Sequence, residues 1–304
     1  MSATPSVTSI LAPDWGEDLS ATELIAQEKS NLHKELEWLL RMEVPAVFMQ
    51  LGLMLKDCAQ TLAGPSGVSS AVAQASVFTA PITNTSDSVK GFAMLEGSRI
   101  IKADVTVRFS KWNKSLPIST SITSKEPWIL SQIQNATNYV QLALSELDDS
   151  SLQHGLFHTR EQVQSVMDRV MAFLRKAQDQ LLFQSNLFPY NIDDLQLNAF
   201  NPRLPADLFV DFSINYAALN VSVYACTLLG TNQPARKPSS VARKKADMLI
   251  GYVHETPYGT RFEIVDHDEV ECPIPSLAQS LAHLKSAYEL CQRMKDKVCT
   301  LKMA

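Results

Sequence analysis

The stretch LHKELEWLLRMEVPAVFMQLGLMLKDCAQTL, residues 32–62, decides the fold of this chain. Its apolar side chains recur at steps of three and four residues, a spacing typical of a helix that packs one apolar face against other helices. The positions on this face are Leu32, Leu36, Leu39, Val44, Val47, Leu51, Leu55, Cys58 and Leu62. A face of this length predicts that another helix covers it.

A second stretch, at the other end of the chain, has the same spacing. Residues 17–43 carry seven acids and three bases, whereas residues 276–304 carry five bases and two acids, so the two ends have net charges of −4 and +3. We therefore expect the end helices to pair antiparallel, with opposite charges side by side. The side chains predicted to form this structural seam are Leu36, Leu39, Val47, Leu51, Leu55, Leu277, Leu281, Leu284, Tyr288 and Cys291.

Local signals set the bounds of the first helix. Ser20 and Glu23 can form a capping box, which predicts a helix start. Pro45 lies inside the helix, and a proline removes one backbone donor and crowds the carbonyl four residues earlier. We therefore expect a kink near Met42. Gly64 and the residues after it predict the helix end.

The middle of the chain alternates between strand and helix patterns. Apolar and polar residues alternate from Ile101 to Phe109, which predicts a strand with one face in water. Helical spacing follows Pro127 and returns after a capping box at Thr159, and Pro275 begins the last helix. Further strands are expected at residues 76–82, 89–96, 117–123, 208–214, 219–225, 248–254, 260–265 and 268–272, with a bend near 216–217.

This order of elements predicts an α+β fold. The helices are expected to form a four-helix bundle closed by antiparallel pairing of the N- and C-terminal helices, because each has one stripe to bury. The strands are expected to form an antiparallel β-sheet domain and could share one sheet. We expect residues 1–19 to be a disordered tail, residues 20–63 with 127–187 and 275–304 to form the bundle, and residues 75–126 with 200–274 to form the β domain.

Composition narrows the class of protein. A chain of 304 residues that is 45% hydrophobic can bury a sizeable core. Its net charge of −5 gives no overall attraction to nucleic acid or anionic membranes. No run of about 18 apolar residues occurs, so we expect no membrane span. The five cysteines are scattered without a CxxC motif, which favours reduced thiols in a cytosolic protein.

Signals for catalysis are sparse. The ten glycines form neither a GxGxxG turn nor a P-loop, and no GxSxG motif occurs. His154 and His158 have metal-like spacing without a second ligand pair, so we interpret them as part of a loop. His267 lies among acidic residues at 266–271, where an acid–base site is conceivable but a strand-end turn is favoured. We therefore predict no enzyme, no metal site and no cofactor.

One loop concentrates positive charge. Between Gly230 and Asp247 the chain is rich in proline and serine, and Asp247 is its single acid. The basic side chains are Arg236, Lys237, Arg243, Lys244 and Lys245. This basic loop is either a contact for an acidic partner or lipid headgroups, or a solvated insertion, and the second interpretation is favoured. Few aromatic residues accompany these bases, which argues against nucleic-acid binding.

Several stretches, in order along the chain, resemble the Rogdi family of leucine-zipper proteins. They are Glu35-Leu36-Glu37-Trp38-Leu39-Leu40 with Glu43-Val44 and Ala46-Val47; Trp128, Leu130, Gln132-Ile133-Gln134, Ala136 and Asn138; Leu204-Pro205, Asp207-Leu208, Ile214-Asn215 and Val223-Tyr224; and Val270-Glu271-Cys272, Ile274-Pro275, Leu290-Cys291-Gln292 and Lys295-Asp296-Lys297. The resemblance runs from about residue 35 to 298. No single motif in it is chemically diagnostic, so the ordered set carries it.

The resemblance implies a helical bundle joined to a β domain. The family is similar to the small subunit of the RAVE/rabconnectin assembly, which promotes assembly of the vacuolar proton pump (V-ATPase). That implies a non-catalytic adaptor, monomeric outside its complex, whose partners are a large WD-repeat protein and, through it, the peripheral sector of the pump. It also implies a cytoplasmic protein that is peripheral at vesicle or endolysosomal membranes.

Two other functions stay open. The end helices could pair between chains, which would make a self-associating coiled-coil protein at vesicle membranes. The acidic residues around His267 could instead serve an enzyme. The chain differs from the family pattern in its N-terminal tail, in Pro45 and in the basic loop, so contacts at these places are not carried over.

Overall fold

The computed structural model describes residues 20–64, 77–83, 88–123, 125–154, 157, 159–183, 199–229, 253–255 and 261–301. The described chain is mixed helix and antiparallel sheet, which confirms the α+β prediction. The helices are α1 (Ala21–Trp38), the π-helical turn η1 (Leu39–Glu43), α2 (Val44–Ala63), α4 (Ser131–His154), α5 (Arg160–Leu182) and α7 (Pro275–Thr300), with a short 3-10 turn η3 (Asn113–Ser115).

The predicted helix starts follow from their caps. The Ser20 hydroxyl accepts from the backbone N–H of Glu23, while the Glu23 carboxylate accepts from the backbone N–H of Ser20. The same reciprocal pair joins Thr159 to Gln162 at the start of α5. Both capping boxes satisfy backbone donors that have no partner inside the helix. The predictions at these two positions are confirmed.

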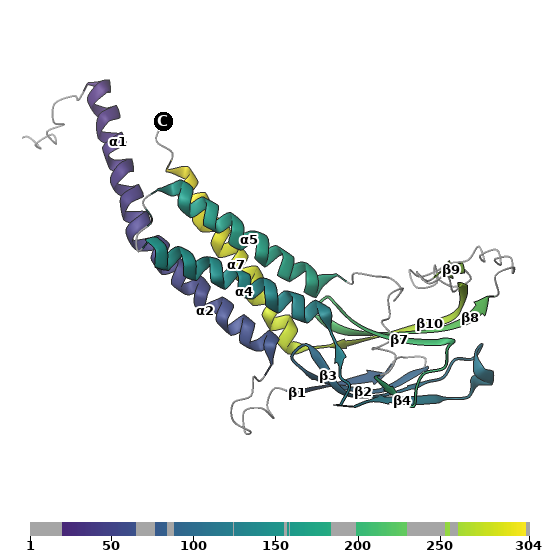
Figure 1. Cartoon of the computed structure of the whole chain (residues 1–304). Helices are drawn as coiled ribbons and strands as arrows, with labels where there is room; N and C mark the ends of the chain where they lie inside the picture. The colour runs from purple at the N-terminus through teal and green to yellow at the C-terminus, as the bar shows by residue number, and fades with distance from the viewer. Residues whose placement is uncertain are drawn as a thin grey trace, which may run out of the picture.

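The irregularity expected near Met42 is a π-helical turn. The backbone N–H of Val44 donates to the carbonyl of Leu39, five residues earlier, and Pro45 follows in the first turn of α2. The wider turn accommodates the missing donor and the ring of the proline. It also brings both Leu39 and Leu40 into the core. Figure 1 shows the chain changing direction here, between α1 and α2.

The four longer helical segments lie alongside one another in Figure 1, and α1 extends beyond them. Helix α2 contacts α4 and α7, and α5 contacts the same two helices. None of the residues of α1 is buried. The helical layer therefore rests on α2, α4, α5 and α7.

The strands form two antiparallel sheets rather than the single sheet that the sequence allowed. The first contains β1 (Val77–Thr83), β2 (Val89–Glu96), β3 (Arg99–Val107), β4 (Ile118–Ile122) and β6 (Phe200–Asn201) in that order, with β5 (Trp128–Ile129) paired to β3. The second has the order β7 (Leu208–Asn215), β8 (Ala218–Leu229), β10 (Arg261–Pro273) and β9 (Val253–Glu255). Each sheet has one strongly buried face, and such faces are covered when two sheets pack together.

Two irregularities in the second sheet explain its sequence pattern. Tyr216 and Ala217 have positive φ angles of 47° and 59°, so they form the tight turn between β7 and β8 where a bend was predicted. The register between β10 and β8 shifts between Ile264 and Asp266. This bulge changes which residues of β10 face the core, so two short strands predicted at 260–265 and 268–272 are one strand.

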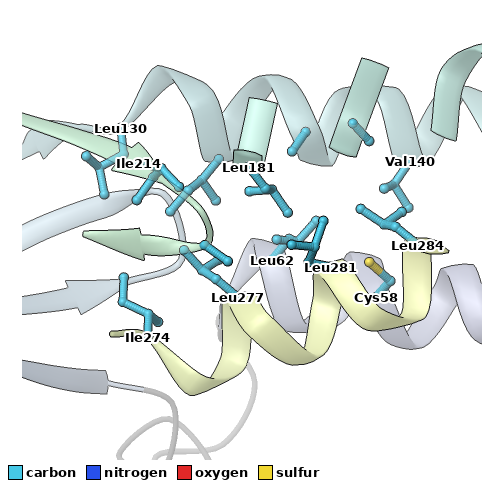
Figure 2. Packing of buried hydrophobic residues seen from close by; sticks show 14 of the residues in the cluster. Cys58, Leu62, Leu130, Val140, Leu181, Ile214, Ile274, Leu277, Leu281 and Leu284 are labelled. Atoms are coloured by element: carbon cyan, nitrogen blue, oxygen red, sulfur yellow. The ribbon is translucent and has the colours of Figure 1, made fainter. Parts of the chain in front are cut away.

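The larger of two hydrophobic clusters among the described residues runs from the helices into both sheets, and the smaller one contains Tyr224, Cys226, Phe262 and Ile264 of the second sheet. Figure 2 shows Leu277 and Leu281 of α7 lying against Leu62 of α2, with Ile214 of β7 and Leu181 of α5 at the sheet end of the same cluster. The predicted division into a bundle domain and a β domain stays a prediction, because the described core is continuous across that boundary.

The end of α2 meets the β2–β3 turn very closely. A Cβ on Gly97 would lie 2.3 Å from the carbonyl oxygen of Ala63, and one on Gly64 would lie 2.7 Å from the backbone nitrogen of Gly97. Both glycines also have positive φ angles. A side chain at either position would separate the helix from the turn, so glycine is required on both sides of this contact.

Candidate functional site

The predicted structural seam lies in the hydrophobic core. Leu51, Leu55, Leu284 and Cys291 are fully buried. Leu39, Val47, Leu277 and Leu281 are between 4% and 8% exposed, and Leu36 and Tyr288 are partly buried against the same cluster. These side chains therefore hold the two ends of the chain to its centre.

Polar contacts fix the direction of the end helices. Near the start of α2 the Glu43 carboxylate forms an ion pair with Lys297, close to the end of α7. Near the end of α2 the Cys58 thiol lies 3.8 Å from the Ser280 carbonyl, and Asp57 lies 3.3 Å from His283. Contacts that pair the start of one helix with the end of the other place α2 and α7 antiparallel.

The side chain of Gln132, at the start of α4, joins three elements. Its Nε2 donates to the carbonyl oxygens of Gln180 at 3.1 Å and Phe183 at 3.0 Å, at the end of α5. It also donates to the Ile214 carbonyl in β7 at 2.8 Å, and its Oε1 accepts from the Ile214 N–H at 2.6 Å. The Gln132 amide thus forms the two backbone hydrogen bonds that a neighbouring strand would otherwise form with Ile214. It joins both α4 and α5 to the second sheet.

Other residues of the family-like stretches lie near this junction. Trp128 packs edge-on against Phe200 of the first sheet and Phe212 of the second, with ring centroids 5.7 Å and 5.4 Å apart. Asp207 accepts from the Trp112 indole N–H at 2.7 Å. One of the family-like stretches therefore contains two residues, Trp128 and Gln132, that join the helices and the two sheets.

The acidic residues around His267 lie within strand β10, so the favoured interpretation as a strand-end turn is wrong. His267 stacks on Tyr224 of β8, with ring centroids 4.4 Å apart. The strand alternates faces, so Asp266 and Asp268 lie on the face opposite His267 and Glu269. The Ser88 hydroxyl donates to Asp268, and the Asn220 amide donates to Glu269. Alternation thus divides the acids between two faces instead of gathering them.

Metal and thiol chemistry find little support in the part of the chain that the structure describes. There, no group of three or more His, Cys, Asp or Glu side chains is placed to hold a metal ion. All five cysteines are free. Burial raises the pKa of the Cys58, Cys226 and Cys291 thiols to about 12, which keeps them protonated and unreactive at neutral pH.

Two expectations from the sequence fall outside the described residues. The first concerns the basic loop with Arg236, Lys237, Arg243, Lys244 and Lys245, whose suggested contact with an acidic partner or lipid stays a prediction. The second concerns His154 and His158, which we interpreted as part of a loop; His158 and the His154 side chain are not described.

Asp211 in β7 has a partly buried carboxyl that lies near Tyr224 and Glu269. It lies directly opposite Ser222 of β8, whose other neighbour is Glu269 of β10. Burial raises the pKa of Asp211 to about 6, against a smaller opposing effect of a backbone hydrogen bond from Phe212. The folded protein therefore binds this proton more tightly than the unfolded chain does, so ionisation of Asp211 destabilises the fold.

This shift predicts a pH-dependent effect of Asp211→Asn. Near pH 4 the carboxyl is protonated in the folded state, so the variant and the parent protein should have similar free energies of unfolding. Between about pH 4 and pH 6 the parent loses stability and the variant does not, because the unfolded chain ionises before the folded protein does. The difference levels off above pH 6 at roughly 3 kcal/mol, which corresponds to a rise of about two units in the pKa. Chemical denaturation at pH 4, 5, 6 and 7 measures this difference. A difference that does not change with pH would contradict the assignment.

A second apolar face of α2 was missed by the sequence analysis. Four large apolar side chains from the end of α1 to the middle of α2 are strongly exposed: Trp38 is 59%, Met42 62%, Met49 70% and Leu53 65% exposed. We call these four residues, with Gly52 between them, the α2 stripe. The spacing of three and four residues had indicated only one apolar face in residues 32–62. The signal that could have revealed a second face is the absence of any charged residue from position 44 to 55.

This second face also explains a membrane-like signal. The helical segment Ala21–Ala63 is long and apolar enough to cross a membrane by length and composition, although no such span was expected. Core helices pass the same test, and α2 contributes its buried face to the core. The segment passes because α2 is apolar on its exposed face as well as on its buried one.

The fold and these contacts define an α+β protein in which zipper-spaced helices from the two ends of the chain lie antiparallel. Residues 35–260 match the family model described as Rogdi leucine zipper containing protein. The chain is 34% identical to a protein rogdi homolog of Rattus norvegicus over 280 residues, covering 90% of this chain and 93% of the relative.

Two further relatives match over a similar length. A protein rogdi homolog of Danio rerio is 32% identical over 279 residues, with 89% of this chain and 93% of the relative covered. Protein rogdi of Drosophila melanogaster is 29% identical over 277 residues, with 90% and 89% covered. The chain belongs to the Rogdi family.

Proposed function

We propose that this chain is a non-catalytic adaptor subunit of a RAVE/rabconnectin-type complex that promotes assembly of the vacuolar proton pump and thereby acidification of vesicles. Its partners would be a large WD-repeat protein and, through it, the peripheral sector of the pump. The observation that carries the proposal is membership of the Rogdi family over almost the whole chain.

The proposal assigns separate tasks to the two parts of the fold. The contacts of α2 with α4 and α7, and of α5 with the same helices, support a four-helix bundle closed by the two ends of the chain. Such a bundle is a rigid support that needs no ligand for its own stability. The exposed α2 stripe supports a role in binding, because large apolar surfaces in contact with water mark interaction sites.

The adaptor would act in the cytoplasm and at the surface of vesicle or endolysosomal membranes. It would reach the membrane through the pump. Outside the complex it would be monomeric, because its zipper-spaced residues are already buried within one chain. This last point distinguishes the adaptor from a self-associating coiled-coil protein.

Affinity purification tests the proposal. The full chain, tagged at one end, is recovered from native cell lysate, and co-purifying proteins are quantified by mass spectrometry against the untagged lysate. We expect strong enrichment of a large WD-repeat protein and of peripheral-sector subunits of the proton pump. Recovery of neither class would contradict the function. A sedimentation experiment on the purified chain should give the mass of a single chain, and a dimer would favour self-association.

A further inference from the structure

Helix α2 has a buried apolar face and, around Met49 and Leu53, an exposed apolar patch that no described residue covers. The buried face includes Val44, Leu51 and Leu55, each with no exposed surface. The other face carries Met49 and Leu53, which are 70% and 65% exposed. Large apolar side chains on a helix are normally covered, so among the described residues this patch of α2 lacks a covering element.

Gly52 supports this view independently. It lies in the middle of α2, where glycine is unfavourable compared with other residues. A Cβ at this position would meet no atom within 4 Å, so packing within the chain does not require glycine. Glycine on a helix surface allows another backbone to approach closely. The glycine is explained if a partner lies against the helix at this point.

The residues next to this face have the character of an interface rim. Helix α1 continues the same segment and buries none of its residues. It carries four acids and two bases: Glu23, Glu28, Glu35 and Glu37, and Lys29 and Lys34. A helix that buries none of its residues gains little stability from packing, so a partner that lies along α1 would stabilise it. The charge of α1 favours a basic partner.

We propose that the α2 stripe binds an amphipathic α-helix of a partner protein, whose apolar residues cover Met49 and Leu53 and whose basic residues lie along α1. The inference rests on the proposed adaptor function in one respect, namely that the helix belongs to a protein of its complex. An apolar centre without charges, flanked by charged residues, is the usual organisation of such an interface.

A second copy of this chain fits the surface poorly. An antiparallel copy centred on Gly52 would end near Met42 and leave α1 uncovered. A parallel copy would place the acids of α1 beside the same acids of its partner.

A lipid surface also fits poorly. Helices that lie on anionic membranes carry lysine and arginine along the polar face. The charged side chains beside the stripe are Glu35, Glu37, Arg41, Lys56 and Asp57, which are more acidic than basic. Arg41 is moreover paired with Glu37 at 2.7 Å. A partner helix with basic residues is the better match to this surface.

Site-specific photo-crosslinking in cells tests the proposal. A photoreactive phenylalanine analogue replaces Met49 in one full-length variant and Glu28 in a second. The matched control replaces Leu142 of α4, an apolar residue that is 46% exposed and lies outside the stripe. After irradiation, the cross-linked segment is sequenced by mass spectrometry. We expect both test positions to label one partner segment with apolar residues at steps of three and four, and Glu28 to label its lysine- or arginine-rich end.

The affinity of the purified chain for the cross-linked segment then tests the same contact without other proteins. The cross-linked segment is synthesised as a peptide, and its binding to the purified chain is measured. We expect Met49→Glu to weaken binding at least tenfold and Leu142→Glu to change it less than twofold, with both variants melting like the parent protein.

Four results would overturn the proposal: labelling of a second copy, labelling of lipid, labelling no stronger than at Leu142, or peptide binding unchanged by Met49→Glu. If pump subunits still co-purify in any of these cases, the surface assignment fails and the adaptor function stands.

Discussion

Deletion of residues 275–304 is expected to abolish the cooperative unfolding of this protein. The deletion removes α7, which contacts both α2 and α5. It would expose Leu51, Leu55 and Leu62 on α2, all at most 1% exposed in the intact chain. Each large apolar side chain that loses its packing costs about 2–5 kcal/mol, and whole proteins are stable by only about 5–15 kcal/mol. The shortened chain therefore cannot retain the native core.

A deletion at the opposite end provides the control. Removal of residues 1–30 takes away most of α1, whose residues are not buried, and retains Leu36 and Leu39 at the seam. Differential scanning calorimetry should show one sharp transition for this variant and none for the variant without α7. A cooperative transition in the chain without α7 would show that the two ends do not close the helical layer.

Substitution of Gln132 by leucine is expected to lower the free energy of unfolding strongly. The change leaves the Ile214 N–H and three carbonyl oxygens without their amide partner, and the two contacts with Ile214 are buried. A buried polar group that loses its partner costs about 1–3 kcal/mol. We expect a loss of at least about 3 kcal/mol in the free energy of unfolding, which is a decrease in Tm of roughly 6–12 °C.

Gln134→Leu is the matched control, because Gln134 lies on the same helix and is exposed. The two substitutions make the same chemical change, so a difference between them measures the contacts of Gln132 alone. Thermal unfolding followed by circular dichroism gives both values. Equal Tm values for the two variants would contradict the role assigned to Gln132 at the junction of helices and sheets.

Local sequence signals predicted the elements well, because they act over a few residues. The capping residues Ser20 and Thr159 mark true helix starts. The alternation from Ile101 to Phe109 matches strand β3, and the parity change near Tyr216 marks a real turn. Pro45 correctly indicated an irregular turn, although its π-helical form could not be derived from a proline alone.

Long-range features were harder to predict. Alternation shows which face of a strand is buried, but not which strand lies beside it, so one sheet was considered where two exist. The bulge before Asp266 made one strand resemble two with a turn at His267. Gln132 was noticed only as part of a family-like pattern, because its four contacts come from residues 48 to 82 positions away.

The charges of the two ends were only partly informative. They indicated an antiparallel arrangement, and Glu43 pairs with Lys297 accordingly. However, Lys295 pairs with Asp168 of α5 at 2.5 Å and not with an acid of the first helix. The acids of α1 lie on a helix that buries none of its residues, which leaves them accessible to a partner. Net charge thus indicated the direction of pairing but not which acids would take part.

The adaptor account is tested most directly by the amount of pump peripheral sector bound to membranes in cells. Cells depleted of the natural protein are supplied with the parent chain, with Met49→Glu or with Leu142→Glu, and membranes are probed for peripheral-sector subunits. The account predicts that depletion lowers the membrane-bound fraction, and that the parent chain and Leu142→Glu restore it while Met49→Glu does not. A membrane-bound fraction that is unchanged by depletion would contradict the account.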